Sequence, residues 1–260
     1  MKNSGVLWTL AIVLALGFSV WQRVSGPTYP IYGRSELNGA PFKYKLERTH
    51  AGPGDHVVVV THGGGALGTL EWREHAAEAP WHAVDMAPSY PAAAIAATIP
   101  HHGPGQKVDY RVTLHAGDAS TVLPAKGVAT LRFRNDVPWW ILIPHIICMM
   151  GALLMSTRAA LEAIAGGPKL KEFTLRTLSA LFLGGFPLGW AVSGFAFGQP
   201  WGGFPIGNDA TDNKTLIAFV AWVIAAVFVF RSRSPRGWVV AAAVVMTLVY
   251  MIPHSFTLPH

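Results

Sequence analysis

Five apolar stretches constrain this chain more than any other feature of its sequence. They run approximately from Val6 to Trp21, Trp139 to Met155, Leu178 to Phe197, Leu216 to Phe230 and Trp238 to Ile252. Stretches of this length and composition are typical of helices that cross a bilayer. Hydrophobic residues make up 51% of the chain and charged residues only 13%, which is about half the charged share of a soluble domain. We therefore expect an integral membrane protein.

Lys and Arg predict how these helices are oriented. They gather in the second-to-third connection, in the fourth-to-fifth connection and before the first stretch: Arg158, Lys169, Lys171, Arg176; Arg231, Arg233, Arg236; and Lys2. Because cytoplasmic loops carry an excess of basic residues, we expect the N-terminus in the cytoplasm of a bacterium and the chain in its inner membrane. Segment 26–136, the loop 198–213 and the C-terminal tail 254–260 are then periplasmic.

The net charge of +6 does not indicate nucleic-acid binding. Most of the excess lies in the connections expected to be cytoplasmic, where basic residues orient helices and meet anionic lipid. Lipid and other membrane subunits are therefore the expected partners, and nucleic acid is not.

The first stretch is expected to be an uncleaved anchor, residues 1–25. Lys2 and the apolar run after it resemble a signal peptide, but Trp21, Gln22 and Arg23 are bulky where cleavage requires small residues. The single cysteine, Cys148, lies in the second stretch. Disulfides are thus excluded, and a thiol in an apolar helix is interpreted as packing.

Residues 26–136 have the pattern of a β-domain, followed by a four-helix transmembrane domain at 137–260. Short runs alternate in polarity between turns rich in Gly and Pro. The predicted strands are 42–49, 56–62, 69–74, 82–86, 92–99, 107–115, 120–123 and 128–134. This spacing predicts an antiparallel sandwich of immunoglobulin or fibronectin type III kind, with Trp72 or Trp81 as its central aromatic residue. A blue-copper sandwich is the main rival, but it needs a Cys ligand that the segment lacks.

Histidine is the one chemically informative residue enriched in this domain, which contains eight of the eleven in the chain. Imidazole suits copper and zinc, and the candidate ligands are His101, His102 and His115. The alternative is a scattered set of surface histidines, because no pair has a ligand spacing joined to a third ligand. Likewise, Thr61-His62-Gly63-Gly64-Gly65 resembles the HGGG element of esterases, but the chain has no Gly-x-Ser-x-Gly elbow. A hairpin turn explains those glycines.

Two histidines follow Ile-Pro pairs in or beside the apolar stretches: His145 and His254. An ionisable residue within a bilayer is a functional candidate. Together they are candidates to ligate haem, a chlorophyll-type pigment or copper, or to hydrogen-bond a quinone. In the structural alternative, His145 bonds a backbone carbonyl freed by a nearby proline and His254 lies among the headgroups.

The outer loop 198–213 and the start of the second stretch carry exposed aromatic candidates for docking. Trp201 and Phe204 lie in a loop rich in Gly and Pro. Only four residues separate the last predicted strand, 128–134, from Trp139 and Trp140, which are expected in the interface belt. Asp212 or Asn213 is expected to cap the fourth helix. Calcium binding by Asp209 and Asp212 is the weaker interpretation, because no full ligand loop is present.

Several short segments resemble a group of uncharacterised bacterial membrane proteins. They are Val137-Pro138, Ile143-Pro144-His145, Arg158, Leu161-Glu162 and 209–215. The resemblance covers most of the chain after about Phe42 and implies no known activity.

We therefore expect a non-catalytic subunit of a larger membrane complex, energy-transducing (photosynthetic or respiratory), that docks partners through the outer domain. The sequence contains no complete catalytic constellation, although it does not exclude an enzyme. The alternatives are a redox or cofactor protein using His145 and His254, and a periplasmic copper or zinc protein using the outer histidines. A transporter is less favoured, because five spans give no even inverted repeat.

Overall fold

A computed structural model of the chain describes residues 4–61, 65–90 and 93–252. Contacts between Cα atoms divide it into a helical unit and a β-domain. The helical unit joins Met1–Pro27 to Val137–His260, and the β-domain is Thr28–Asp136. The fold is therefore mixed helix and sheet, as the sequence predicts.

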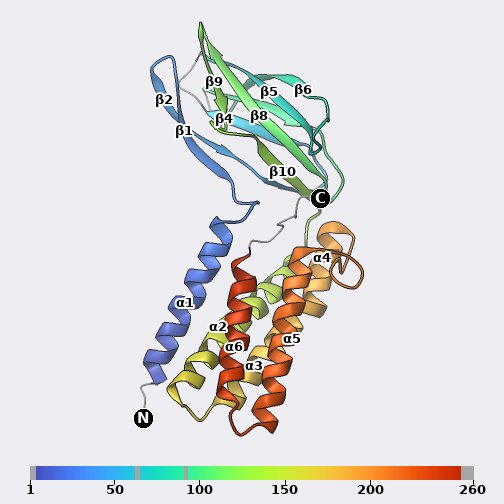
Figure 1. Cartoon of the computed structure of the whole chain (residues 1–260). Coiled ribbons are helices and arrows are strands. Elements are labelled where there is room, and N and C mark those ends of the chain that lie inside the picture. The colour runs from blue at the N-terminus through green and yellow to red at the C-terminus, as the bar shows by residue number, and fades with distance from the viewer. Residues whose placement is uncertain (1–3, 62–64, 91–92, 253–260) are drawn as a thin grey trace. The chain divides into compact units, whose positions relative to one another are not determined.

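In the helical unit, the helices lie side by side (Figure 1). They are α1 (Ser4–Val24), α2 (Trp139–Ala165), α3 (Leu170–Leu183), a π-turn η1 (Gly184–Leu188), α4 (Gly189–Phe197), α5 (Ala210–Arg231) and α6 (Arg236–Met251). Four helical segments of the described chain are long and apolar enough to span a membrane: Ser4–Val24, Trp139–Ala165, Leu170–Phe197 and Ala210–Arg231. The fifth predicted span corresponds to α6, whose 16 residues are fewer than the roughly 20 that a span needs.

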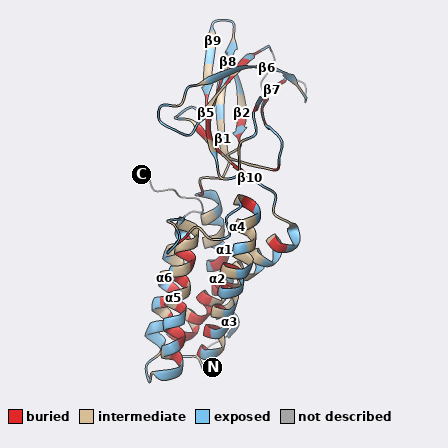
Figure 2. Ribbon diagram, turned by 90° about the vertical axis from the view of Figure 1, so that its right-hand side faces the viewer, coloured by how far each residue is buried: buried red, intermediate tan, exposed pale blue. Residues whose placement is uncertain are grey.

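Small residues allow these helices to pack closely. Figure 2 shows buried residues along α2, α3, α5 and α6, among them Ala152, Ala159, Ala163, Ala218, Ala225, Ala242 and Ala243. Trp222 of α5 is completely buried among them. Close approach of small residues is the usual basis of helix association in lipid, where the hydrophobic effect between helices is absent.

The structure corrects the position of Arg158, which the sequence analysis placed in the connection between two spans. Helix α2 continues past it to Ala165 and ends where Gly166 adopts a left-handed φ of 72°. Arg158 is only 2% exposed. Its Nη1 lies 2.7 Å from Oε2 of Glu162, and its guanidinium lies over the ring of Phe173 at 4.4 Å. Pairing within one helix therefore lets both charges be buried.

Glu162 should be a strong determinant of the stability of the helical unit. Glu162→Gln leaves Arg158 charged and buried, so we expect the free energy of unfolding to fall by about 3 kcal/mol. The double variant Arg158→Met/Glu162→Leu should lose less, because it removes both charges. Chemical unfolding of the full chain in detergent micelles measures these changes.

Glu172→Gln is the matched control, because Glu172 pairs with Arg176 at an exposed site. Its expected effect is below about 1 kcal/mol. If Glu162→Gln cost no more than this control, the buried pair would not have the role assigned to it.

The β-domain is built from strands that form one nearly closed sheet and a separate hairpin. The hairpin pairs β1 (Ile31–Leu37) with β2 (Ala40–Leu46). The remaining strands are β3 (Thr49–Ala51), β4 (His56–Thr61), β5 (Leu67–Glu74), β6 (His82–Ser89), β7 (Ala94–Ile99), β8 (Lys107–Ala116), β9 (Ala119–Leu123) and β10 (Ala129–Arg134). Their order is β3-β10-β8-β5-β6-β7-β4, with β9 also paired to β8.

Strand β6 joins the two halves of this sheet. It pairs with β5 through residues 82–86 and with β7 through residues 87–89. The inward residues of β8 (Val108, Tyr110, Val112 and Leu114) are completely buried, as their alternation predicts. The hydroxyl of Tyr110 donates to the carbonyl of Glu47 at 2.7 Å, so the polar group of this core residue is satisfied.

Candidate functional site

His145 lies beside the π-turn that interrupts the third span. Its Nδ1 is 2.9 Å from the carbonyl oxygen of Gly184, the first residue of η1. Pro187 lies within this turn and lacks the N–H that a regular helix needs. The regular i→i−4 hydrogen bonding of the helix is therefore interrupted there. A carbonyl can only accept, and Nδ1 is therefore protonated. In neutral His145 the opposite nitrogen, Nε2, is left with a lone pair for a second partner.

The second predicted ligand, His254, lies outside the described residues. His145 does bond a backbone carbonyl, that of Gly184, and the cofactor hypothesis stays a prediction. A ring fixed through Nδ1 with Nε2 available is the usual arrangement of a ligating histidine.

The loop between α4 and α5 is held in place by its own hydrogen bonds. The Gly202 N–H donates to Asp212 Oδ2 at 2.6 Å and the Phe204 N–H to Asn213 Oδ1 at 2.7 Å. The indole of Trp201 stacks on Phe186 with centroids 5.9 Å apart. Trp201 is therefore half-buried against its own chain, whereas Phe204 is 69% exposed.

The cap of α5 differs from the expectation. Asp209, and neither Asp212 nor Asn213, is the N-cap, because its side chain accepts from the N–H groups of Thr211 and Asp212. Asp212 and Asn213 lie in the first turn and hold the loop instead. Both candidate calcium carboxylates are thus engaged in hydrogen bonds to the backbone.

Trp139 and Trp140 open α2 and are 72% and 59% exposed. Together with Phe204 and Ile206, which is 73% exposed, they are among the many large apolar side chains that the fold of the helical unit does not cover, Ile147 and Ile164 included.

In the β-domain, the structure separates the three candidate metal ligands. His115 lies near the end of β8, where it pairs with Ser120. The rings of His101 and His102 instead contact Phe133, at 5.7 and 5.2 Å between centroids, and Phe133 N–H bonds Gln106 just before β8 begins. The length of β8 therefore places His115 about 25 Å from His101 and His102. No group of three His, Cys, Asp or Glu side chains within the described ranges is placed to hold a metal ion.

His50 and His56 form a pair at the same end of the domain. Nε2 of His50 bonds the carbonyl of Gly54 at 2.8 Å and must donate, so in neutral His50 the other nitrogen accepts from Nδ1 of His56 at 3.3 Å. Burial, together with the neighbouring His50, lowers the pKa of His56 to about 4.

This shift predicts an acid-sensitive domain. In the unfolded chain the pKa of His56 is about 6.5, so the folded state takes up fewer protons. The contribution of neutral His56 to the free energy of unfolding is complete above pH 6.5. It declines as the pH falls towards about 4 and changes no further below that. We expect His56→Gln to flatten this part of the stability profile, measured by denaturant unfolding of the full chain with the β-sheet infrared signal. The exposed His115→Gln should retain it, and equal profiles for wild type and His56→Gln would refute the assignment.

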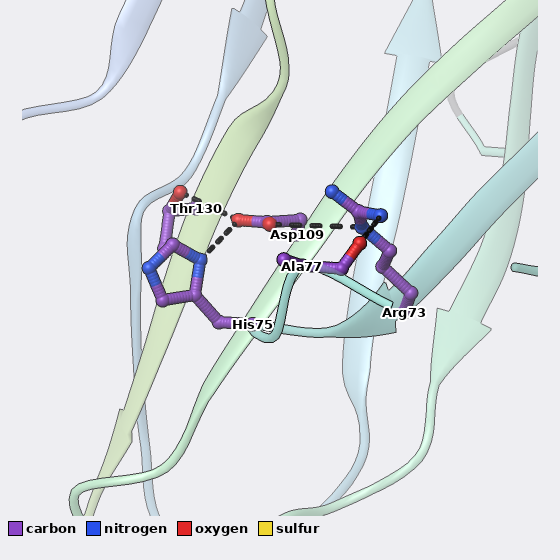
Figure 3. Close-up of polar contacts among 5 residues, drawn as sticks. All are labelled: Arg73, His75, Ala77, Asp109 and Thr130. Carbon is purple, nitrogen blue, oxygen red and sulfur yellow. Dashed lines mark hydrogen bonds and ion pairs between the residues drawn. The ribbon is translucent and has the colours of Figure 1, made fainter. Parts of the chain in front are cut away.

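A buried carboxylate organises a polar network that the sequence analysis missed. Figure 3 shows Asp109 between His75, Thr130 and Arg73. Its Oδ1 accepts from Nδ1 of His75 and from Oγ1 of Thr130, both at 2.8 Å, and Nε of Arg73 lies 3.9 Å from Oδ2. Asp109 is 4% exposed, although the alternation of β8 places it on the solvated face. Arg73 and Thr130 both lie directly opposite Asp109 on the neighbouring strands. The network could have been predicted only by aligning these strands in register.

The network orients a histidine without completing a catalytic set. The second ring nitrogen of His75 points away from Asp109 (Figure 3). His75, His102 and Lys107 line a polar cavity of about 280 Å³. Nucleophilic catalysis would need a hydroxyl or thiol bonded to the oriented imidazole, and the hydrogen bonds of the described residues give His75 no such partner.

Comparison with known proteins gives no match: no family model, curated protein or solved structure is significantly similar to this chain.

Proposed function

We propose that this chain is a non-catalytic membrane subunit that docks other subunits of a larger complex at the outer face of a bacterial inner membrane. The single observation that carries the proposal is the loop between α4 and α5. Its hydrogen bonds to Asp212 and Asn213 fix the backbone while Phe204 and Ile206 remain exposed. Rigid, exposed aromatic and aliphatic side chains are what an interface uses as anchors, because little entropy is lost when they are buried.

The β-domain is the second docking element of the proposal. Its neighbour relations support an immunoglobulin-type interpretation: β4 beside β7 corresponds to the B–E pair, and β5, β8 and β10 correspond to the C–F–G sheet. Trp72 on β5 then takes the position of the strand C tryptophan. Such domains commonly serve as binding modules rather than as enzymes.

The positive-inside pattern supports the proposed orientation, with the α2–α3 and α5–α6 connections in the cytoplasm. An energy-transducing host, photosynthetic or respiratory, is the assembly we favour. It rests on the membrane-embedded helices and on the imidazole of His145 beside η1.

The docking role predicts that the loop controls partner retention. Phe204→Ser/Ile206→Ser should reduce the amount of partner that co-purifies from native membranes about tenfold or more, because hot-spot residues each contribute at least about 2 kcal/mol. The matched control is Ile164→Ser, which changes a residue that is 69% exposed on α2. Undiminished retention with the double variant would leave lipid headgroups as the target of the loop.

A second candidate function, a cofactor-binding redox subunit, is favoured by the available Nε2 of His145. Protein purified in mild detergent should then show a haem or pigment absorption band, or bound copper, that His145→Ala removes. A colourless, metal-free preparation from native membranes rules this candidate out.

A further inference from the structure

An apolar groove lies between α1, α2 and α6 of the helical unit (Figure 1). It has a volume of about 290 Å³ and is lined by Leu14 and Phe18 of α1, by residues of α2 between Thr157 and Ile164, and by residues of α6 between Val240 and Leu248. Its lining side chains are apolar except for two threonines. We call this the α1–α6 groove. It offers a ligand close apolar contact and almost no hydrogen bonds.

The groove is part of the fold, because α1 is held against the other helices on both sides of it. Near the start of α1, Trp8 packs edge-on against Phe173 of α3, with ring centroids 5.7 Å apart. Near its end, Nε2 of Gln22 donates to the carbonyl of Tyr250 of α6 at 2.9 Å. Between these contacts Ala15 is buried in the helical core. The groove is therefore not a gap left by a detached helix.

The size of the groove favours an acyl chain as its occupant. A volume of about 290 Å³ holds roughly ten groups of the size of a water molecule, at about 30 Å³ each. A methylene group is of similar size, so a segment of one acyl chain fills the groove. A partner helix is about 10–12 Å across with its side chains and could insert only single side chains.

Arg236 marks one end of the groove. It begins α6 and lies one turn before Val240, so both residues are on the same face of that helix. Its guanidinium also lies against Gly166, where an added Cβ would come within 2.8 Å of Nη1. Gly166 follows Ile164, the last groove residue of α2, by two positions. The cation is thus placed where the groove residues of α2 and α6 both end.

The charges around this end favour an anionic headgroup. Residues 158–176 and 231–236 contain the basic residues Arg158, Lys169, Lys171, Arg176, Arg231, Arg233 and Arg236 and the acidic residues Glu162 and Glu172. Both carboxylates are already engaged, Glu162 by Arg158 and Glu172 by Arg176. Arg236 has no ion pair within the described ranges, although the carbonyl end of α2 favours its charge. A lipid phosphate at this level would therefore meet an excess of positive charge.

We propose that the α1–α6 groove binds one anionic phospholipid, with a segment of an acyl chain between α1 and α6 and the phosphate at Arg236. The acyl segment gains packing contacts, since the hydrophobic effect does not drive association within lipid. Arg236 then selects the headgroup by its charge. This site goes beyond the proposed docking function, because it lies at the end of the helical unit away from the α4–α5 loop and needs no protein partner.

Lipid retention by the full chain tests the proposal. The chain is purified in mild detergent and mixed with micelles that contain phosphatidylglycerol and phosphatidylcholine with identical acyl chains. Native mass spectrometry then counts the lipids that stay bound. We expect one phosphatidylglycerol per chain and about fivefold less phosphatidylcholine, because one basic residue contributes about 1 kcal/mol towards an anionic lipid. Equal retention of the two lipids, or retention of neither, would overturn the proposal.

Charge variants locate the headgroup. Arg236→Gln should lower the retention of phosphatidylglycerol about fivefold, to the level of phosphatidylcholine, whereas Arg236→Lys should preserve it. The matched control is Lys171→Gln, because Lys171 lies over the ring of Phe230 at 5.4 Å, and Phe230 is not a groove residue. An equal loss with Lys171→Gln would mean that the lipid senses the general charge of this surface and has no site at Arg236.

A groove-filling variant locates the acyl chain. Ala160→Leu places extra bulk in the groove and should lower the retention of phosphatidylglycerol about fivefold or more, because a close-packed site does not tolerate added methylene groups. Ala221→Leu is the control, since Ala221 is also half-buried in the helical unit but lies on α5 outside the groove. Unchanged retention with Ala160→Leu would reject the groove as the site of the chain.

Two further results would assign the groove to another occupant. A dimer of this chain that Ala160→Leu dissociates would assign it to self-association. A co-purifying protein that is lost with Ala160→Leu but kept with Ala221→Leu would assign it to a side chain of a partner helix. If both leucine variants unfold, the selectivity of the unmodified chain for phosphatidylglycerol and the Arg236 variants still decide the proposal.

Discussion

Satisfaction of backbone polar groups is the constraint on which the rest of this structure depends. In hydrocarbon every N–H and C=O must find a partner within the protein, and Pro187 lacks the N–H that a regular helix would direct to Leu183. The chain accommodates this proline in the π-turn η1, and beside it the imidazole of His145 donates to the carbonyl of Gly184. His145, a candidate cofactor ligand, is thus also a hydrogen-bond donor to the backbone of an interrupted helix.

The same constraint organises the β-domain. Most strand edges there are paired, β6 serves two neighbours, and β3 closes one end by pairing in parallel with β10. This pairing stops at β3 and β4, the two ends of the sheet order, and the hairpin of β1 and β2 is paired only within itself. Buried side-chain groups follow the rule as well: the Asp109 carboxylate enters the interior because His75 and Thr130 both donate to it. Burial of polar groups is tolerated where the partners are supplied.

Periodicity in the sequence predicted the regular parts of the fold. The runs 107–115 and 128–134 correspond closely to β8 and β10, because one face of each is apolar. β1 was missed, since Gly33 interrupts its pattern; a Cβ at that position would collide with the ring of Tyr44, so the glycine serves packing and not a turn. β3, at three residues, is too short to show a period.

The burial of Arg158 and the hydrogen bond between His75 and Asp109 could not be predicted from the sequence pattern. They depend on specific neighbours that charge and polarity alone do not identify. Arg158 resembled a loop residue because it is charged, but Glu162 four residues on and the ring of Phe173 allow it to be buried. His75 and Asp109 are separated by 34 residues, and no motif links them. Charge and polarity assign residues to an environment on average, whereas the geometry of a few specific neighbours decides the exceptions.

The loop that carries Phe204 is also mechanically tied to α5. The side chains that hold Gly202 and Phe204 belong to the first turn of that helix, so the loop and the helix start move as one body. Helices that span a bilayer change their tilt with its thickness. If α5 spans a bilayer as proposed, a change in its tilt would therefore move the loop that carries Phe204, and the thickness of that bilayer would influence how the loop is presented.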